Sequence, residues 1–366
     1  MSGTPSFFPS PTVAWYMARM FLARTFAILF ALVLVLQSLD LLSESGNILA
    51  VKTNGQAEIL RYMSLRIPEI ASLFLPFSVL LGTILTLITM NQNSEVVALK
   101  ASGMSAHQVL APLLVASLGV AVVSFAFNDR IVARATATLD QWQRAEYGPV
   151  PIDRGDRTNV WVRDGDDLIE VAQVSGRGPA TRLTSITYYE RDRGVLVAII
   201  RAPRGVRAED GWRIGPAERF EVGTGKQTRE PSMIIGRGVR PDQLTLAAVD
   251  PDGLSFGALR AAIGDLSESG RPTKALEGAL WHKLSGPLSS VLMPLLGAVA
   301  AFGIARSGKL FIRAVIGMLL GFTYFVADNF ALAMGNLGAY PPFLAAWAPF
   351  LLFLLIGEAV LIRTEE

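Results

Sequence analysis

Six long apolar stretches, separated three and three by a polar segment of about 150 residues, dominate the pattern of this chain. Each stretch holds about 18–24 mostly apolar residues, which is enough for a helix to cross a hydrocarbon core of about 30 Å. A helix satisfies its own backbone groups in lipid, so the pattern predicts a helical membrane protein. One such stretch would fit a buried helix of a water-soluble protein, but six favour membrane spans. The predicted spans are Met20–Leu42, Leu73–Met90, Val109–Phe127, Leu284–Ile304, Phe311–Met334 and Phe343–Ile362.

The polar segment between the third and fourth spans has a strand pattern. Short runs rich in Val, Ile, Tyr and Trp alternate with polar residues and are separated by Gly, Pro, Asp or Arg turns. Helical periodicity is scarce there, so the alternation predicts an antiparallel sandwich or jelly roll. The predicted strands are Asn159–Arg163, Asp167–Val174, Thr184–Arg191, Gly194–Ala202, Ala217–Gly223 and Ser232–Val239. Alternation makes one set of side chains face inward, towards either an apolar groove or an ordinary closed core: Val160, Val162, Ile169, Val171, Ile186, Tyr188, Val195, Val197, Phe220 and Val222.

After Asp250 the apolar residues recur at helical spacing, and a second helix is expected to run from about Pro272 towards the fourth span. We therefore expect a six-span membrane protein with an inserted all-β domain, in four parts. These are residues 1–128 with spans one to three, 129–253 with the β domain, 254–283 with a helical link, and 284–366 with spans four to six. The first span has too long an apolar run for a signal peptide, so we expect it to remain as an anchor.

Basic residues outside the β domain predict the orientation. Seven lie on one predicted face: Arg19, Arg24, Lys100, Arg306, Lys309, Arg313 and Arg363. The short loops of the other face carry only Lys52, Arg61 and Arg66. The positive-inside rule then places both termini in the cytoplasm and the β domain on the far side of the membrane. Between Asp129 and His282 the 22 basic and 22 acidic residues balance, which is typical of a folded domain.

The amino-acid composition excludes several kinds of chemistry. The chain has 51% hydrophobic residues and a mean hydropathy of +0.41, in agreement with a membrane protein. It has no cysteine, which excludes disulfides, thiolate nucleophiles and cysteine metal sites. Its two histidines, His107 and His282, are far apart, and we predict no metal, no cofactor and no nucleic-acid partner. The segment Gly303–Lys309 has the spacing of a phosphate-binding loop, but Leu310 replaces the magnesium-binding Ser or Thr, so we interpret it as a basic turn.

Carboxylates within the spans are candidate functional groups, because a charge in hydrocarbon is costly. Asp40 and Glu358 lie near span ends, where water can solvate them. Asp328, beside Asn329, lies well inside the fifth span. For Asp328 a packing contact and a role in a transport pathway both stay open.

The loop after the second span predicts a short amphipathic helix on the cytoplasmic face. Ser94 is placed to cap it, Glu95 favours its positive end, and Gly103 ends it. An isolated helix of two turns is not stable in water, so we expect it to dock on a partner. The alternative is a plain connector on the lipid surface.

These features resemble a known family. The motif Ser94-Glu95-x-x-x-x-Lys100-Ala-Ser-Gly103 is similar to the coupling helix of the lipopolysaccharide-export ABC permeases, the LptF/LptG family. The order of three spans, a jelly-roll insert, a helical link and three more spans also matches. Two later stretches resemble the LptG branch more than the LptF branch: Gly321-Phe-Thr-Tyr-Phe-Val-Ala-Asp328-Asn-Phe330 and Tyr340-Pro-Pro-Phe-Leu-Ala-Ala-Trp-Ala-Pro349. So does Leu246-x-x-x-Asp250-Pro-Asp-x-Leu254-Ser255.

The resemblance implies a permease subunit, not an enzyme, in a Gram-negative inner membrane. Such a subunit pairs with an LptF-like permease over an LptB-like ATPase dimer, and joins an LptC-like membrane-anchored jelly roll. Lipopolysaccharide from the outer leaflet enters between span one of one permease and span five of the other. ATP-driven closure then passes it to the periplasmic jelly rolls and an LptA-like bridge towards the outer membrane.

The resemblance also implies residue roles. Glu95 would meet a basic residue of the ATPase, within a coupling helix of residues 94–103: Ser94, Glu95, Val96, Ala98, Leu99, Lys100, Ala101, Ser102 and Gly103. Of these, Val96, Ala98, Leu99, Ala101 and Gly103 would form the docked surface. The lipid gate would comprise Phe26, Phe30, Val33, Gln37 and Asp40 of the first span, and Leu319, Phe322, Phe325, Val326 and Phe330 of the fifth.

One departure from the family concerns the phosphates of lipid A. Relatives often carry lysines near the outer end of span one, but here the segment from Gln37 to Glu44 holds no cation. Headgroup contacts would then come from Lys52, Arg61 or Arg66, or from the partner permease, or the substrate would carry fewer phosphates. Three alternatives remain for the function: the LptF paralogue, a non-transporting periplasmic scaffold or receptor, and a membrane hydrolase. The absence of Cys and of a nucleophile elbow argues against the hydrolase.

Overall fold

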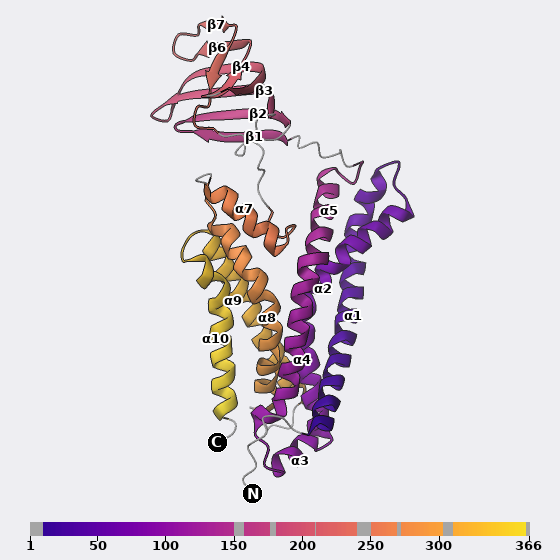
Figure 1. Ribbon diagram of the computed structural model, residues 1–366. Helices are drawn as coiled ribbons and strands as arrows, with labels where there is room; N and C mark the ends of the chain where they lie inside the picture. The colour runs from indigo at the N-terminus through magenta and orange to yellow at the C-terminus, as the bar shows by residue number, and fades with distance from the viewer. Residues whose placement is uncertain are drawn as a thin grey trace. The chain divides into compact units, whose positions relative to one another are not determined.

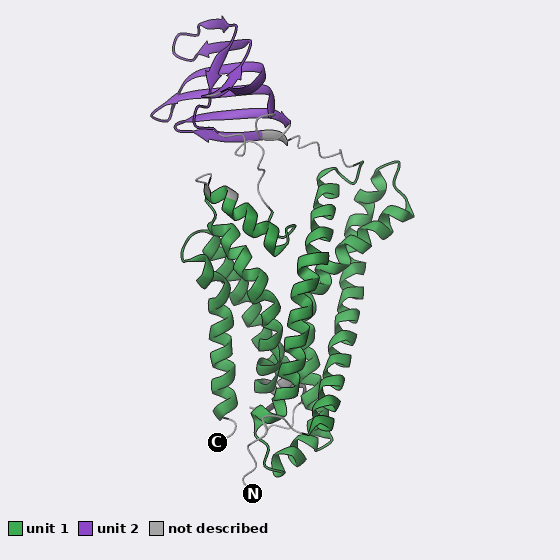
Figure 2. Ribbon diagram, in the orientation of Figure 1, with its two compact units in different colours: residues 1–150, 250–267, 271–366 green, residues 151–249, 268–270 purple. Residues whose placement is uncertain are grey.

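The computed structural model describes residues 10–149, 157–175, 181–208, 210–239, 250–268, 272–302 and 310–363. They form two compact units (Figure 2). Unit 1 comprises residues 1–150, 250–267 and 271–366, and unit 2 comprises residues 151–249 and 268–270. Residues 129–150, which the sequence assigned to the β domain, therefore belong to unit 1.

Unit 1 is helical (Figure 1). Its elements are α1 (Pro11–Ala50), α2 (Gln56–Gln92), α3 (Glu95–Ala101), α4 (Ala106–Phe127), the π-helical turn η1 (Asn128–Val132), α5 (Ala133–Arg144), α7 (Phe256–Glu268), α8 (Lys274–Phe302), α9 (Leu310–Asn336) and α10 (Pro342–Arg363). Helix α1 packs on α2, while α8 packs on α2, α4, α9 and α10. The start of α1, helix α3 and the end of α10 lie at the same end of the unit (Figure 1).

Five described helical segments are long and apolar enough to cross a membrane. They are α1, α2, the continuous helix Ala106–Arg144, residues 315–336 of α9, and α10. The predicted fourth span falls on α8, a helix of 29 residues, and its predicted end at Ile304 lies outside the described residues. The second predicted link helix and the fourth span are thus one helix, which continues through Pro287 and Pro294.

The first three spans are longer than their apolar runs, and α2 already begins at Gln56, well before the predicted Leu73. Helix α1 continues to Ala50, and α4 continues through η1 and α5 to Arg144. The extensions bury a second apolar cluster that includes Ile48, Tyr62 and Trp142. Burial of these large side chains stabilises helix beyond the hydrocarbon-length run, which explains why the predicted ends were too early.

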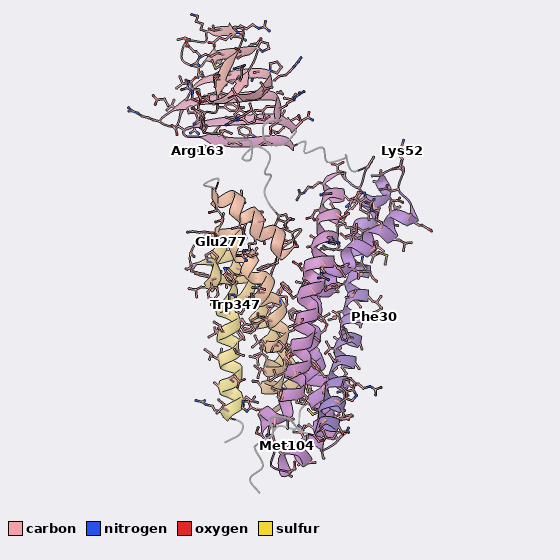
Figure 3. All side chains as sticks on the ribbon, in the orientation of Figure 1. Phe30, Lys52, Met104, Arg163, Glu277 and Trp347 are labelled. Atoms are coloured by element: carbon pink, nitrogen blue, oxygen red, sulfur yellow. The ribbon has the colours of Figure 1, made fainter. Side chains whose placement is uncertain are left out.

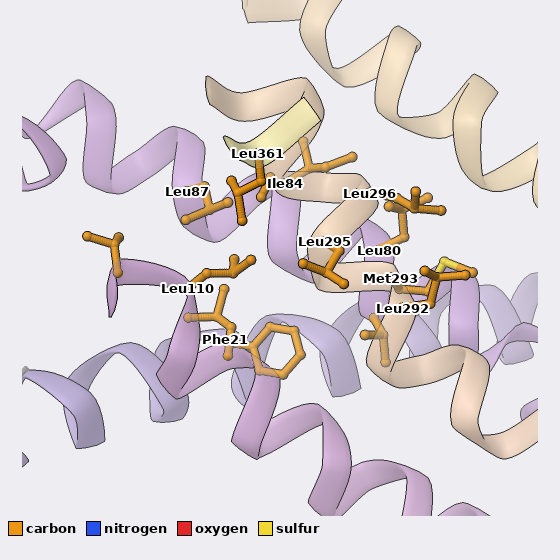
Figure 4. Close-up of a cluster of buried hydrophobic side chains, with 14 of the residues drawn as sticks. Phe21, Leu80, Ile84, Leu87, Leu110, Leu292, Met293, Leu295, Leu296 and Leu361 are labelled. Carbon is orange, nitrogen blue, oxygen red and sulfur yellow. The ribbon is translucent and has the colours of Figure 1, made fainter. Parts of the chain in front are cut away.

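The main core of unit 1 joins α1, α2, α4, α8, α9 and α10 (Figure 4). Phe21, Leu80, Leu110 and Leu296 are almost fully buried in it. Small residues bring the helices close: a Cβ built on Gly82 of α2 would clash with Thr25 Oγ1 of α1. Such contacts are the usual way for helices to associate in lipid.

Unit 2 contains an antiparallel sheet. Its strands are β1 (Arg157–Asp164), β2 (Asp167–Ser175), β3 (Arg182–Asp192), β4 (Val195–Ala208), β5 (Gly211–Ile214), β6 (Ala217–Glu221), β7 (Gln227–Glu230) and β8 (Met233–Ile235). The order is β1-β2-β3-β4-β5-β8, and the first half of the long strand β4 pairs with β6, which pairs with β7. The sheet confirms the predicted strand content, but the four-residue strands β5 and β7 had too little alternation to be predicted.

The inward face of the sheet was predicted correctly for β1 to β3. Ile169, Val171 and Ile186 are buried, and Val160, Val162 and Tyr188 pack against the same core. The prediction was wrong for Val195, Val197, Phe220 and Val222, whose side chains are exposed. Ala198, Ile200 and Ala202 of β4 face inward instead. The residues from Val195 to Ile200 are all apolar, so alternation alone does not predict which of them face inward. The exposed Arg201 shows that the odd-numbered residues face outward.

Candidate functional site: the coupling segment, the gate helices and a polar cavity

Helix α3 lies where the short amphipathic helix was predicted, over Glu95–Ala101. Glu95 occupies its first turn, and Gly103 follows its end with a φ of +89°, a conformation that favours glycine. The predicted side-chain cap is wrong: Ser94 has a φ of 59° and its hydroxyl makes no capping hydrogen bond. Ser94 therefore precedes α3 with a left-handed backbone. This backbone turn, and not a hydrogen bond to the Ser94 hydroxyl, connects α2 to α3.

The two faces of α3 differ in environment. Val96 is buried and Leu99 packs against the core of unit 1, so both anchor α3 to the protein itself. Both were predicted on the docked surface; Val96 is buried by its own chain, whereas Leu99 is half-buried and its contact with a partner stays a prediction. The exposed face carries Val97 at 59% exposure, with Ala98, Lys100, Ala101, Ser102 and Gly103 also exposed. Val97 was missed, although its spacing to Ala101 places both on one side of the helix.

Glu95 has internal partners. Tyr16 Oη of α1 donates to Glu95 Oε1 over 3.3 Å, and Asn93 Nδ2 donates to the same oxygen over 3.2 Å. The carboxylate is half-buried, so it is less open to solvent than the sequence suggested. The contact joins the start of α1 to the first turn of α3. Sequence patterns gave no sign of it, because 79 residues separate the two side chains.

The predicted gate residues lie mostly on exposed helix faces. Phe26 and Phe30 of α1 are exposed, and Phe30 is labelled on its helix in Figure 3. On α9 the exposed residues are Leu319, Phe322, Val326 and Phe330. Val33 is half-buried, and half-buried Phe325 contacts Phe77 of α2 with ring centroids 5.4 Å apart.

The polar end of the predicted gate is an internal network. Asp40 accepts a 2.6 Å hydrogen bond from Tyr62 and lies 3.3 Å from Arg66. Arg66 also pairs with Glu69 at 2.7 Å. Gln37 is buried, and neither polar atom of its side-chain amide has a hydrogen-bond partner among the described residues.

The three candidate headgroup cations have different surroundings. Arg66 is engaged by two carboxylates, and the Arg61 guanidinium lies 4.7 Å from the centroid of the Trp142 ring. Lys52 is exposed in the turn after α1 and is labelled in Figure 3. Of the three, Lys52 and Arg61 are the better placed to reach an external anion.

Two carboxylates of the spans face histidines. Glu358 Oε2 of α10 lies 3.1 Å from His107 Nε2 of α4. Asp328 Oδ2 of α9 lies 3.8 Å from His282 Nδ1 of α8. Asp328 and His282 both line a cavity of about 380 Å³ between α2, α4, η1, α8 and α9.

Within the described residues no group of three His, Asp or Glu side chains is placed to hold a metal ion. The Gly303–Lys309 segment lies outside the described residues.

The comparisons with known proteins agree with this architecture. Residues 15–363 match the model of the family "Lipopolysaccharide export system permease LptF/LptG". The chain is 25% identical over 306 residues to the lipopolysaccharide export system permease protein LptG of Escherichia coli K12, covering 82% of this chain and 84% of that protein. It is 24% identical over 310 residues to the LptG protein of Haemophilus influenzae, with coverages of 83% and 86%.

Proposed function

We propose, since this chain belongs to the LptF/LptG family of lipopolysaccharide export permeases, that it is an LptG-like subunit that moves lipopolysaccharide out of the inner membrane. ATP hydrolysis is carried out by a separate LptB-like dimer. An LptF-like permease forms the other half of the membrane unit, and LptC-like and LptA-like jelly rolls receive the lipid. The family match over nearly the whole chain supports this proposal.

The topology follows from charge and helix length. Six spans, with α8 as the fourth, put the start of α1, helix α3 and the end of α10 in the cytoplasm. The basic residues of the short loops support this orientation. Unit 2 is then a periplasmic domain, and its antiparallel sheet supports a jelly-roll fold.

The observation on which the proposal depends most is that α3 has one face packed on unit 1 and one face exposed. Val96 and Leu99 fix it to the membrane unit, so its other face is free to meet a partner. That face presents Val97, Ala98 and Ala101, which suit a close apolar contact, beside the carboxylate of Glu95. An ATPase that carries a basic residue in its groove would exchange the Tyr16 hydroxyl for a stronger, charge-assisted partner at Glu95.

Replacement of Glu95 tests the coupling role. Glu95→Ala should reduce both copurification of the ATPase subunit and ATP hydrolysis by the assembled complex, because loss of one partner of a desolvated charge pair costs about 2–5 kcal/mol. Tyr16→Phe is the matched control, since it removes the internal hydrogen bond and leaves the carboxylate. Wild-type copurification and ATPase activity in Glu95→Ala would remove the coupling role.

The lipid entrance is formed by the exposed faces of α1 and α9. Phe30→Cys and Phe322→Cys, at exposed positions of the two helices, should crosslink to lipopolysaccharide or to the partner permease, with a low background because the chain has no cysteine. Val115→Cys on α4 and Leu352→Cys on α10 are controls, since both residues are exposed apolar positions on other spans. Crosslinking at the control positions alone would place the gate elsewhere.

The inner face of the sheet is the route for acyl chains through unit 2. Photo-crosslinkers at Ile169 and Ile186, which point into the core, should give lipid adducts only with ATP. Phe220, which is exposed on another face of the sheet, is the control position. Adducts at Phe220 with none at the two inward positions would leave the inner face as an ordinary closed core.

A further inference from the structure

The cavity of unit 1 is polar at one end and apolar at the other. Ser72 of α2 hydrogen bonds Asn128 of η1, and His282 faces Asp328 at the same level. About one helical turn away, Phe77 of α2 contacts Phe325 of α9, and both rings line the apolar end. With a volume of about 380 Å³, the space suits a small amphiphile.

The charges around the cavity do not balance. Its described lining carries four carboxylates, Glu69, Asp129, Asp252 and Asp328, against the bases Lys283 and His282. Glu69 pairs with Arg66, and Asp129 accepts a hydrogen bond from the Phe256 backbone N–H. These partners leave the negative charge in excess, so the lining favours a cation over an anion.

Asp328 is the group that points to a ligand. It is 7% exposed, and its Oδ1 has no hydrogen-bond partner among the described residues. Its nearest base, His282, is 3.8 Å away, beyond hydrogen-bond distance. A buried carboxylate with an unused oxygen is costly, and a donor entering the cavity would satisfy it.

We propose that this cavity is a binding site for an amphiphile with an ammonium head and a single apolar chain. The ammonium group binds the Asp328 carboxylate, and the chain lies along Phe77, Met293 and Phe325. A metal ion is a poorer match, because the described carboxylates are not grouped for one. Phe325 belongs to both this cavity and the predicted lipid gate, whereas Phe77, Met293 and Asp328 belong to the cavity and not to the predicted gate.

Direct binding tests the site without any transport reaction. The whole chain, with the subunits that copurify, is placed in phosphatidylcholine nanodiscs and dialysed against radiolabelled n-decylamine, n-decanoate or n-decanol. Empty nanodiscs correct for partition into lipid. We expect saturable binding of about one decylamine per chain, at least about tenfold tighter than that of the alcohol, and no saturable binding of decanoate.

Two variants locate the site, and one serves as a control. Asp328→Asn keeps the shape and removes the charge, so it should weaken decylamine binding about tenfold or more. Ala279→Phe fills the lining and leaves Asp328 in place, so it should abolish binding even if Asp328→Asn fails to fold. Glu358→Gln alters the other carboxylate–histidine pair and should change nothing. Absence of saturable decylamine binding to the wild type would overturn the proposal, and so would binding by Ala279→Phe that equals the wild type's. Because the assay measures no transport, neither result bears on the export function.

Discussion

The contact between α1 and α2 at Gly82 gives a prediction of stability that the structure allows to be quantified. In Gly82→Ala the new Cβ would clash with Thr25 Oγ1 and would lie 3.0 Å from Thr25 N and 3.1 Å from Thr25 Cα. Rotation of the hydroxyl relieves only the first contact, because the other two atoms belong to the backbone of α1. Overpacking of this kind costs about 1–3 kcal/mol, and alanine returns about 1 kcal/mol through its higher helix propensity.

The matched control is Gly119→Ala on α4, where nothing lies within 4 Å of the new Cβ. It receives the same propensity gain without the clash, so the difference between the two variants isolates the packing cost. We expect Gly82→Ala to be less stable than Gly119→Ala by about 1–3 kcal/mol. Unfolding of the detergent-solubilised protein by sodium dodecyl sulfate, followed by circular dichroism, measures the difference. Equal stability of the two variants would show that α1 and α2 do not approach as closely as described.

The remaining predictions concern the sheet and the coupling helix. Ile169→Ala, at a position 1% exposed, should cost about 2–5 kcal/mol in denaturant unfolding of the sheet, whereas Val197→Ala, at 39% exposed, should cost less than about 1 kcal/mol; similar costs would reverse the assignment of the two faces. Burial and the hydrogen bond that Tyr188 donates to Asp167 raise the pKa of Tyr188 above its ordinary 10.0. The contribution of this neutral side chain to the free energy of unfolding is therefore present below about pH 10 and is lost as the pH rises further. Tyr188→Phe should lack this part of the pH dependence, and unchanged curves would exclude Tyr188 as the cause. Val97→Asp should reduce recovery of the ATPase subunit about tenfold in pull-down assays without loss of helix content, and full recovery would exclude Val97 from the interface.

The helical part of the fold was largely predictable, because a hydrocarbon-length apolar run has few alternatives in lipid. The exact helix ends were not, since Ala50 and Arg144 are set by tertiary burial of Ile48, Tyr62 and Trp142, which lie far apart in sequence. Local patterns carry no information about such contacts.

The sheet shows the same limit at a finer scale. Alternation located β1 to β3 and their inward residues because polar residues occupy the other parity. In β4 the apolar run from Val195 to Ile200 contains both parities, and pairing with β3 and β6 decides which face is buried.

The candidate site was predicted in position and only partly in detail. The spacing from Ser94 to Gly103 located α3, but a helix of two turns has too few residues to reveal which face its own protein buries. Val96 is therefore internal, Leu99 is half-buried, and Val97 is exposed. The Tyr16–Glu95 contact and the surroundings of Asp328 depend on helix packing and could not be predicted from spacing.

We propose that this chain carries lipopolysaccharide out of the inner membrane under the control of a partner ATPase. Proteoliposomes that hold the chain with its copurifying subunits and lipopolysaccharide, mixed with a soluble jelly-roll acceptor bearing a photo-crosslinker, test this function most directly. We expect lipopolysaccharide adducts on the acceptor that require hydrolysable ATP and are lost in the Glu95→Ala complex. A complex that hydrolyses ATP at full rate yet gives no ATP-dependent adduct would exclude the proposed export function.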